Sequence, residues 1–319
     1  MLSHNRNAMI YDHYGRPLNS LRIQLNATCN FKCFFCHMEG TETNGEFLTP
    51  EEIEKVVKVA ADNGVNRVKL TGGEPLLRKD LEEIIGRIRA HIDGDISLTT
   101  NAFFLNGRAR SLKDSGLNRI NISLHSVDRD KFKEITGIDA INRVKEGIED
   151  AARSGLNPIK INFVVLKDLN DDQVDSMIEF TSKNGLVLQL IEYETDRAGE
   201  KSDTFQKYHY DLRKIEERLN DRVLKVEHNS LHNREKFYVS TDSGSIAVVE
   251  FVRPQRNADF CNHCTRLRIT SRGEFQTCLN RRDQVFSFRG KDEEGIFNVY
   301  REAVMARVPY WSEADESSY

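Results

Sequence analysis

Residues 49–71 read TPEEIEKVVKVAADNGVNRVKLT and carry the clearest structural signal in the chain. Thr49 is a good helix N-cap, Pro50 suits the first helical turn, and the two glutamates that follow complement the positive end of a helix. We therefore expect a helix from Pro50 to about Asn63. The apolar run Arg67–Thr71 has the length and composition of a strand. The stretch predicts a helix followed by a strand, which is one unit of an α/β fold.

Five similar strand-like runs lie on either side of this unit and are separated by segments of helical length. They are Leu21–Asn26, Ile96–Thr100, Arg119–Leu124, Ile159–Leu166 and Val187–Glu192. Six βα units are too few to close an eight-stranded barrel. We therefore predict an α/β fold with a partial (βα)6 TIM-like barrel. In such folds the active site lies at the carboxyl ends of the strands.

The alternation of strand-like runs with segments of helical length ends at about residue 195. A polar stretch and a short helix-like segment are followed by β-rich runs, which are Val223–His228, Lys236–Ser240, Ser245–Val252 and Arg266–Thr270. We therefore predict two domains, a partial barrel over residues 1–195 and a smaller C-terminal β-rich α+β domain over residues 196–319. A length of 319 residues fits one full domain with a smaller one appended.

Charge and hydropathy exclude several classes of protein. Lys and Arg total 46 against 50 Asp and Glu, so the net charge is −4. This balance excludes a globally basic nucleic-acid-binding protein, although a local basic site for an anionic small molecule remains compatible. No run approaches the roughly 18 apolar residues of a membrane helix, and the N-terminus lacks the apolar core of a signal peptide. We expect a cytoplasmic protein that binds neither nucleic acid nor a membrane.

The six cysteines fall in two groups of three. Cys29, Cys33 and Cys36 form a C-x3-C-x2-C loop directly after the first strand-like run, and such close spacing favours metal ligation over disulfides. A 4Fe-4S cluster held by three thiolates keeps one iron open for an exogenous ligand, whereas structural zinc takes four protein ligands. The alternative is a Cys3His zinc site with His37, but His37 adjoins Cys36 and would turn onto the same ion with difficulty.

The second group is Cys261, Cys264 and Cys278, with His263 inside its first loop. A hairpin turn at residues 272–274 would return Cys278 to the other two cysteines. A Cys3His zinc site is a strong alternative here, because a C-x2-C knuckle with one more Cys and one His is a common zinc arrangement. Nearby arginines favour a second open iron that faces an anion. Both assignments stay open on spacing alone.

Several cations stand at strand ends or beside the second cysteine group. Arg266 and Arg268 flank one leucine within a strand-like run, so both guanidinium groups lie on one face and could bind a polyphosphate together. Arg22, Lys69 and Lys160 are further candidates. For each cation considered alone, a solvated surface position is an equally good interpretation.

Residues 71–75, Thr-Gly-Gly-Glu-Pro, follow a predicted strand and precede a helix. The turn is not a P-loop, because it lacks the glycine spacing and the Lys-Ser/Thr pair that hold phosphates. Its two glycines allow another segment or a ligand to approach closely, although an ordinary βα turn would look the same. His125 ends another strand run, and a hydrogen-bonded wall histidine is a simpler interpretation of it than an acid or base.

Together these motifs resemble a known family. The C-x3-C-x2-C loop with an aromatic residue before its third cysteine, followed by Gly-Gly-Glu-Pro, resembles the signature of radical S-adenosylmethionine (SAM) enzymes. The second group reads C-N-H-C-T-R-L-R, with thirteen residues between Cys264 and Cys278, and resembles the C-terminal cluster motif of the GTP 3′,8-cyclase family. This family carries out the first step of molybdenum cofactor biosynthesis. Order and spacing agree from Gly15-Arg16-Pro17 to about Gly290.

The resemblance implies two 4Fe-4S clusters and SAM as cofactors. The first cluster would cleave SAM to a 5′-deoxyadenosyl radical, which takes a hydrogen atom from the 3′ carbon of GTP. The sugar radical then attacks carbon 8 of guanine and gives (8S)-3′,8-cyclo-7,8-dihydroguanosine 5′-triphosphate. The second cluster would position the purine through its own open iron.

The resemblance also implies roles for individual residues. SAM would contact Phe35, Gly73, Ser123 and, with less support from the motif, Glu194. GTP would be held by a set of polar and basic side chains, namely Arg22, Lys69, Thr99, Lys160, Arg266 and Arg268. The residues expected to take part in catalysis are Cys29, Cys33, Cys36, Arg266 and Arg268.

The sequence departs from the family pattern at a few positions. Gln189 and Lys69 stand where many members carry arginine, and lysine cannot reproduce an arginine fork. Glu194 replaces an apolar residue. The chain ends with Glu316–Tyr319 where the family usually has a Gly-Gly tail.

The resemblance further implies partners. An electron donor of the flavodoxin or ferredoxin type and a downstream cyclic pyranopterin monophosphate synthase are expected, and a homodimer is compatible. Two other functions stay open on the sequence. One is a radical SAM enzyme with an auxiliary cluster that acts on a peptide or a different nucleotide, although a fully ligated auxiliary cluster would need a fourth thiol. The other is a zinc-stabilised binding protein without catalysis.

Overall fold

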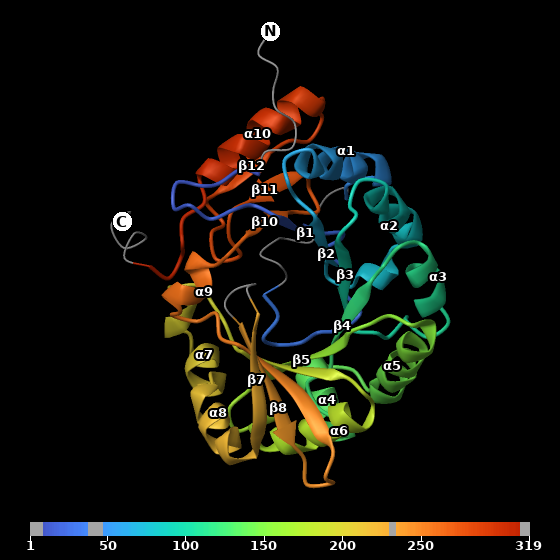
Figure 1. Ribbon diagram of the computed structural model, residues 1–319, viewed down its shortest axis with the longest axis vertical. Coiled ribbons are helices and arrows are strands. Elements are labelled where there is room, and N and C mark those ends of the chain that lie inside the picture. Colours follow the sequence, from blue (N-terminus) through green and yellow to red (C-terminus); the bar gives the residue numbers. More distant parts are fainter. Residues whose placement is uncertain (1–8, 38–46, 230–233, 313–319) are drawn as a thin grey trace.

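The computed structural model describes residues 9–37, 47–229 and 234–312. Its centre is a twelve-stranded sheet with the order β12-β11-β10-β1-β2-β3-β4-β5-β6-β9-β8-β7. Figure 1 shows that the sheet curls around the middle of the molecule and that the helices lie on its outside. The predicted α/β class and the open, barrel-like curl are confirmed.

The six strands expected from the sequence form the parallel centre of the sheet, each paired with the next. They are β1 (Ser20–Gln24), β2 (Arg67–Thr71), β3 (Asp95–Thr100), β4 (Arg119–Ser123), β5 (Ile159–Val165) and β6 (Val187–Glu192). Their limits differ from the predicted ones only at the ends.

Helices cover the outer face of these strands. They are α1 (Pro50–Ala61), α2 (Leu81–Arg89), α3 (Ala109–Asp114), α4 (Arg129–Thr136), α5 (Ile141–Ser154) and α6 (Val174–Lys183). Two short 3-10 turns, η2 (Pro75–Leu77) and η3 (Asp171–Gln173), lie in the connections. The helix predicted from Pro50 begins there, and Thr49 and Glu52 form a reciprocal capping box at its start.

Alternation along the strands separates the core from the interior of the barrel. In β5, Ile159, Ile161 and Phe163 are buried on the face that the helices cover, whereas Lys160 and Asn162 point to the other face and line a cavity. Neighbouring strands follow the same period-2 pattern. The apolar core therefore lies between the sheet and the helices, and the concave face of the sheet is polar.

The C-terminal part adds strands to both edges of the central sheet. On the β6 side, β9 (Ile246–Val252) pairs in parallel with β6 and is followed by β8 (Arg234–Ser240) and β7 (Val223–Asn229). On the β1 side, β10 (Arg266–Ile269) pairs in parallel with β1. The strands β11 (Glu274–Gln276) and β12 (Val285–Ser287) complete that edge.

Further helices accompany these strands. They are α7 (Asp203–Tyr208), α8 (Arg213–Leu219), α9 (Ala258–Asn262) and α10 (Glu293–Met305), with the 3-10 turns η4 (Gly199–Lys201) and η5 (Asn220–Arg222). The expected β-rich C-terminal part is present, but its strands continue the barrel sheet. A division into two domains at residue 195 stays a prediction. Within the described ranges, no helix combines the length and the apolar character needed to cross a bilayer.

Candidate active site

A cavity of about 780 Å³ lies on the concave side of the sheet. This volume is within the range of about 300–1,000 Å³ typical of ligand sites. Every residue assigned to the site from the sequence lines it, namely Cys29, Cys33, Cys36, Cys261, Cys264, Cys278, Phe35, Gly73, Ser123, Glu194, Arg22, Lys69, Thr99, Lys160, Arg266 and Arg268. The two cysteine groups, which are far apart in the sequence, therefore face one cavity.

The first cysteine loop follows β1 and packs directly on the glycine turn that follows β2. The backbone N–H of Gly73 donates to the carbonyl of Asn26 at 2.8 Å and to its side-chain Oδ1 at 3.1 Å. A Cβ atom on Gly73 would lie 2.1 Å from the carbonyl oxygen of Thr28, which is far inside van der Waals contact. Glycine is therefore required here because the two loops touch, which is one of the interpretations that the sequence analysis left open.

Glu74 fixes the far side of the same turn. Its buried carboxylate accepts hydrogen bonds from the backbone N–H of Leu76 at 2.9 Å, the hydroxyl of Thr100 at 2.6 Å and the backbone N–H of Asn101 at 2.7 Å. Burial raises the pKa of Glu74 to about 7, and these three donors oppose that rise. The carboxylate ties the turn after β2 to the end of β3.

The first three cysteines are free thiols with an environment suited to a cationic ligand. Burial raises the pKa of Cys29, and it raises the pKa of Cys33 to about 12, with the nearby thiols adding to both shifts. The protein alone thus disfavours thiolates at this loop. A positively charged metal group would compensate and release the protons, so the donor set fits an iron–sulfur cluster.

The second cysteine group stands beside arginines. Cys261 lies on α9, and burial raises the pKa of its thiol to about 12. Burial also acts to raise the pKa of Cys264, but the charges of Arg266, Arg307 and Arg16, together with a hydrogen bond from the backbone of Arg266, outweigh it and lower that pKa. The turn predicted before β11 is present, since β10 and β11 pair antiparallel, and the Cys278 thiol is close enough to influence the pKa of Cys261.

His263 does not line the cavity with the three cysteines of the second group. His263 is half exposed, and its Nδ1 lies 3.2 Å from the carboxylate of Asp259, away from the cavity-lining set. Within the part of the chain that the structure describes, no three His, Cys, Asp or Glu side chains converge on a single ion.

A buried arginine brace supports the second group from behind. Arg16 Nη1 donates to the carbonyl of Cys261 at 2.9 Å, and Arg307 donates to the carbonyl of Cys264. Both arginines meet Asp12, whose Oδ2 lies 2.8 Å from Arg16 Nε and 3.4 Å from Arg307 Nη1. The sequence analysis missed this brace. Arg16 appeared there only as the start of the resemblance, and Arg307 lies in a stretch without any motif.

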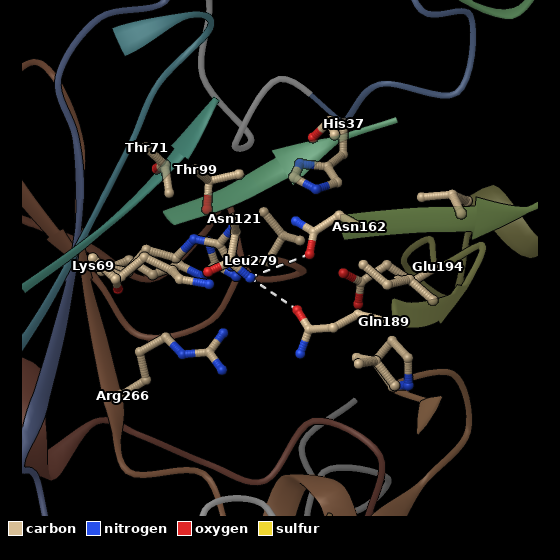
Figure 2. Close-up of a pocket in the computed structure, with 18 of the residues that line it drawn as sticks. His37, Lys69, Thr71, Thr99, Asn121, Asn162, Gln189, Glu194, Arg266 and Leu279 are labelled. Carbon is tan, nitrogen blue, oxygen red and sulfur yellow. Dashed lines mark hydrogen bonds between the residues drawn. The ribbon is translucent and has the colours of Figure 1, made fainter. Parts of the chain in front are cut away.

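One wall of the cavity is cationic. Arg268 on β10, Arg22 on β1 and Lys69 on β2 are register partners on neighbouring strands, and Arg266 lies on the same face of β10. The expected common face of Arg266 and Arg268 is thus confirmed, because both line the cavity. Figure 2 shows Lys69 and Arg266 on one side of the space, facing Gln189 and Glu194 on the other.

The opposite wall is built from amides. Asn121 on β4 donates to Gln189 Oε1 on β6 at 2.9 Å and to Asn162 Oδ1 on β5 at 3.2 Å, as the dashed lines in Figure 2 mark. Gln189 in turn donates to the carboxylate of Glu250 on β9 at 2.6 Å. The glutamine that stands in place of the family's usual arginine is therefore part of a hydrogen-bonded row across four strands.

Two buried hydroxyl groups on β3 indicate that the cavity binds a polar ligand. Ser97 and Thr99 both line the cavity, and their hydroxyl oxygens are buried without a hydrogen-bond partner among the described residues. Buried polar groups are normally satisfied, so a polar ligand in the cavity would complete them. Ser97 was missed from the sequence, where only its alternation with Thr99 would have indicated it.

The comparisons with known proteins agree with this geometry. Residues 23–181 match the radical SAM superfamily, and residues 186–311 match the family described as Molybdenum Cofactor Synthesis C. The "Probable GTP 3′,8-cyclase" of Thermoplasma volcanium is 55% identical over 309 residues, which are 97% of this chain and 94% of that protein. This chain belongs to the GTP 3′,8-cyclase family. A second cyclase relative, from Thermococcus kodakarensis, is 44% identical and covers 95% of this chain and 100% of that protein.

Solved structures share the fold of this member of the cyclase family. Streptococcus suis SuiB bound to the precursor peptide SuiA has a TM-score of 0.67 at 19% identity, covering 95% of this chain and 67% of SuiB. SuiB bound to S-adenosylmethionine has a TM-score of 0.63 at 19% identity, covering 83% of this chain and 61% of SuiB. Native anSMEcpe with bound AdoMet has a TM-score of 0.60 at 16% identity, covering 88% and 81%. At these identities the likeness concerns the fold alone.

Membership in the GTP 3′,8-cyclase family brings with it radical SAM chemistry, with SAM and iron–sulfur clusters as cofactors. It also decides against the non-catalytic zinc protein and the peptide enzyme that the sequence had left open. The terminal residues Glu316–Tyr319, where the family pattern has Gly-Gly, lie outside the described residues.

Proposed function

We propose that this protein converts GTP to (8S)-3′,8-cyclo-7,8-dihydroguanosine 5′-triphosphate, the first step of molybdenum cofactor biosynthesis. The observation that carries the proposal is a single cavity that two cysteine groups face, with a row of cations between them. Membership in the GTP 3′,8-cyclase family supports the same reaction.

The first cysteine loop and its surroundings form the SAM half of the proposed site. When bound, the first cluster and SAM supply the radical that removes a hydrogen atom from the sugar. Cys29, Cys33 and Cys36 would hold that cluster, and Phe35 of the same loop packs against His125 with ring centroids 4.9 Å apart.

The other half of the proposed site holds the nucleotide. Cys261, Cys264 and Cys278 would hold the second cluster, which would supply an open iron for the purine. Arg266 and Arg268 form hydrogen bonds with the polyphosphate in the geometry that guanidinium groups favour. Fixing both ends of the substrate sets the 3′ carbon against the SAM half, and such orientation supplies a large part of catalysis in general.

The finer parts of the proposal concern partners. A flavodoxin- or ferredoxin-like donor would supply the electron, and the exposed positions of Cys29 and Cys36 give such a donor access to the first cysteine loop. A cyclic pyranopterin monophosphate synthase takes up the product. We propose that both steps take place in the cytoplasm.

Iron counting with spectroscopy tests the proposal first. After anaerobic reconstitution we expect about eight irons per chain, since each cubane holds four. Electron paramagnetic resonance of the reduced protein should change at one cluster when GTP is added. About four irons, or no response to GTP, would contradict the second cluster and its role. Matched variants Cys33→Ser and Cys264→Ser should each remove about half of the iron.

Two variants separate the proposed halves of the site. Cys33→Ser should abolish SAM cleavage, measured as release of 5′-deoxyadenosine, because the first cluster is lost. Arg266→Ala should weaken GTP binding but leave slow cleavage that is not coupled to product. Equal loss of cleavage in both variants would count against separate roles.

A further inference from the structure

The arginine brace behind the second cysteine group contains two bases and one acid. Asp12 Oδ2 lies 2.8 Å from Arg16 Nε and 3.4 Å from Arg307 Nη1. The side chains of Arg16, Arg307 and Asp12 are only 7%, 1% and 0% exposed. Within the described part of the chain, no other carboxylate lies at ion-pair distance from either arginine. The brace therefore carries one excess positive charge in a place where solvent screens it little.

The positive side of the brace faces the cysteines. Arg16 Nη1 donates to the carbonyl of Cys261 at 2.9 Å. Arg307 donates to the carbonyl of Cys264. Both arginines line the cavity together with these cysteines, whereas Asp12 is not among the lining residues.

The charges of the brace act on the second cysteine group. Burial acts to raise the pKa of the Cys264 thiol, but that pKa is lowered, and the charges of Arg307 and Arg16 are among the causes. Three thiolates outweigh the positive charge of an oxidised cubane core, so a cluster held there is an anion, and reduction adds to its negative charge. A buried cation nearby stabilises such an anion, and the more negative reduced state gains more than the oxidised one.

We propose that Asp12, Arg16 and Arg307 balance the charge of the second cluster, so that their one excess positive charge stabilises the anionic cluster and raises its reduction potential. They are positioning residues, because they act through Cys261 and Cys264 and ligate no iron themselves. This inference rests on the proposed function in one respect, namely that the second cysteine group holds an iron–sulfur cluster.

Variants that change the charge of the brace test the proposal. Arg307→Met leaves the close pair of Arg16 and Asp12 and makes the brace neutral. We expect reduction of the second cluster to become about tenfold less favourable, which is about 59 mV for one electron. Arg16→Met also makes the brace neutral and should lower the potential similarly. Asp12→Asn adds a positive charge and should raise the potential by a similar amount.

A double variant separates the charge of the brace from its geometry. Asp12→Asn with Arg307→Met has the same net charge as the wild type, but it lacks the ion pairs and the hydrogen bond from Arg307 to Cys264. Its second cluster should have the wild-type potential. Arg110→Met is the matched control, because Arg110 is an arginine that pairs with Asp114 at the exposed surface of α3. It should change the potential of neither cluster.

The measurement is a redox titration of the anaerobically reconstituted holoenzyme without GTP, followed by electron paramagnetic resonance. Addition of SAM to a separate sample marks the signal of the first cluster, since SAM is the cofactor of that cluster. The other signal belongs to the second cluster, and the potential of the first cluster serves as an internal reference. Iron content and thermal melts check that each variant is loaded and folded.

Several outcomes would overturn the assignment of the brace. They are equal potentials in all variants, a fall in only one of the two methionine variants, or a double variant whose potential stays as low as that of Arg307→Met. If Asp12→Asn does not fold, Arg307→Met and Arg16→Met decide. If a neutral brace no longer holds the second cluster, iron content replaces the potential. Recovery of that iron in the double variant then supports the assignment, and its absence contradicts it.

The proposed function fails separately from the role of the brace. A wild-type protein with about eight irons, whose second potential follows the charge of the brace but which does not convert GTP, would overturn the reaction and keep the assignment. A wild-type protein with about four irons, or with zinc at the second cysteine group, overturns both the second cluster and the role of the brace.

Discussion

At the scale of single residues, His125 shows how burial fixes the chemistry of a side chain. Its Nδ1 accepts a hydrogen bond from the backbone N–H of Val164 at 3.2 Å, so the neutral ring carries its proton on Nε2. The ring is buried in the cavity wall and packs edge-on against Phe35. Burial lowers the pKa of His125 to about 4. The interpretation as a wall histidine is consistent with this geometry, and the side chain stays neutral at physiological pH.

His125→Asn should change how stability depends on pH. The histidine pKa is about 6.5 in the unfolded wild-type chain and about 4 in the folded one. Between these two pH values the unfolded chain therefore binds more protons than the folded chain. The wild type should therefore lose about 2 kcal/mol of unfolding free energy from this residue between pH 7 and pH 5. The asparagine oxygen can take the place of Nδ1, and the variant should lack this loss. Urea unfolding at the two pH values measures it.

The exposed residue His13 provides the control for that experiment. His13→Asn should keep the pH dependence of the wild type. Equal slopes for the wild type and His125→Asn would mean that His125 titrates alike in the folded and unfolded chains, and would contradict its buried neutral state.

At the scale of elements, the turn after β2 and the cysteine loop after β1 act as one unit. The close approach of Gly73 to Thr28 leaves no room for any side chain, and Glu74 locks the other end of the turn to β3. The position of the first three cysteines therefore depends on a neighbouring turn that contains none of them.

Gly73→Ala should displace the first cysteine loop. A Cβ atom 2.1 Å from the Thr28 carbonyl forces the loops apart. We expect the variant to hold about half the wild-type iron after reconstitution, because only the first of two equal clusters is affected. Gly86→Ala is the matched control, since nothing lies within 4 Å of its Cβ position in α2. It should keep its iron and gain about 0.5–1 kcal/mol of stability. Full iron content in Gly73→Ala would show that the loop tolerates the displacement.

Local patterns carried most of the prediction at this scale. The six central strands and the capped helix at Pro50 follow from short-range periodicity and capping, which the sequence displays directly. The pairing of β9 with β6 and of β10 with β1 depends on register between distant segments, which no local pattern encodes. For that reason the sequence analysis expected an appended β-rich domain, whereas the structure shows that its strands continue the same sheet.

The difference between local patterns and contacts between distant segments also applies to the candidate active site. Cysteine spacing and the Gly-Gly turn indicated their positions because the ligands of one cluster lie in one loop. The partners of Lys160 could not be found in this way, because Glu250 is brought to it only by the sheet order β5-β6-β9. Asp12 and Arg307 likewise meet only in the folded chain.

At the scale of the whole molecule, the arginine brace joins three distant segments. Asp12 near the start of the chain binds Arg16 and Arg307, and these arginines hold the carbonyls of Cys261 and Cys264. The side chains of Asp12, Arg16 and Arg307 are almost completely buried. Removing the one carboxylate would leave two buried cations without their shared counter-charge, which is costly.

Asp12→Asn should destabilise the protein by about 3 kcal/mol, in the range measured when one partner of a buried ion pair is removed. Asp114→Asn is the control, because Asp114 pairs with Arg110 at the exposed surface of α3. That change should alter stability by less than about 1 kcal/mol. Chemical unfolding monitored by fluorescence measures both. Similar small effects would show that the brace does not couple the two ends of the chain.

The parallel pairing of β1 with β10 has a consequence for the protein during its synthesis. In a chain still attached to the ribosome, β1 gains its β2 neighbour early, but its other edge stays unpaired until residue 269 has emerged. An unpaired strand edge invites pairing with other chains. The cationic wall is completed at the same late moment, and the second cysteine group follows when Cys278 has emerged. The second cysteine group can therefore be complete only on a chain that is almost fully translated.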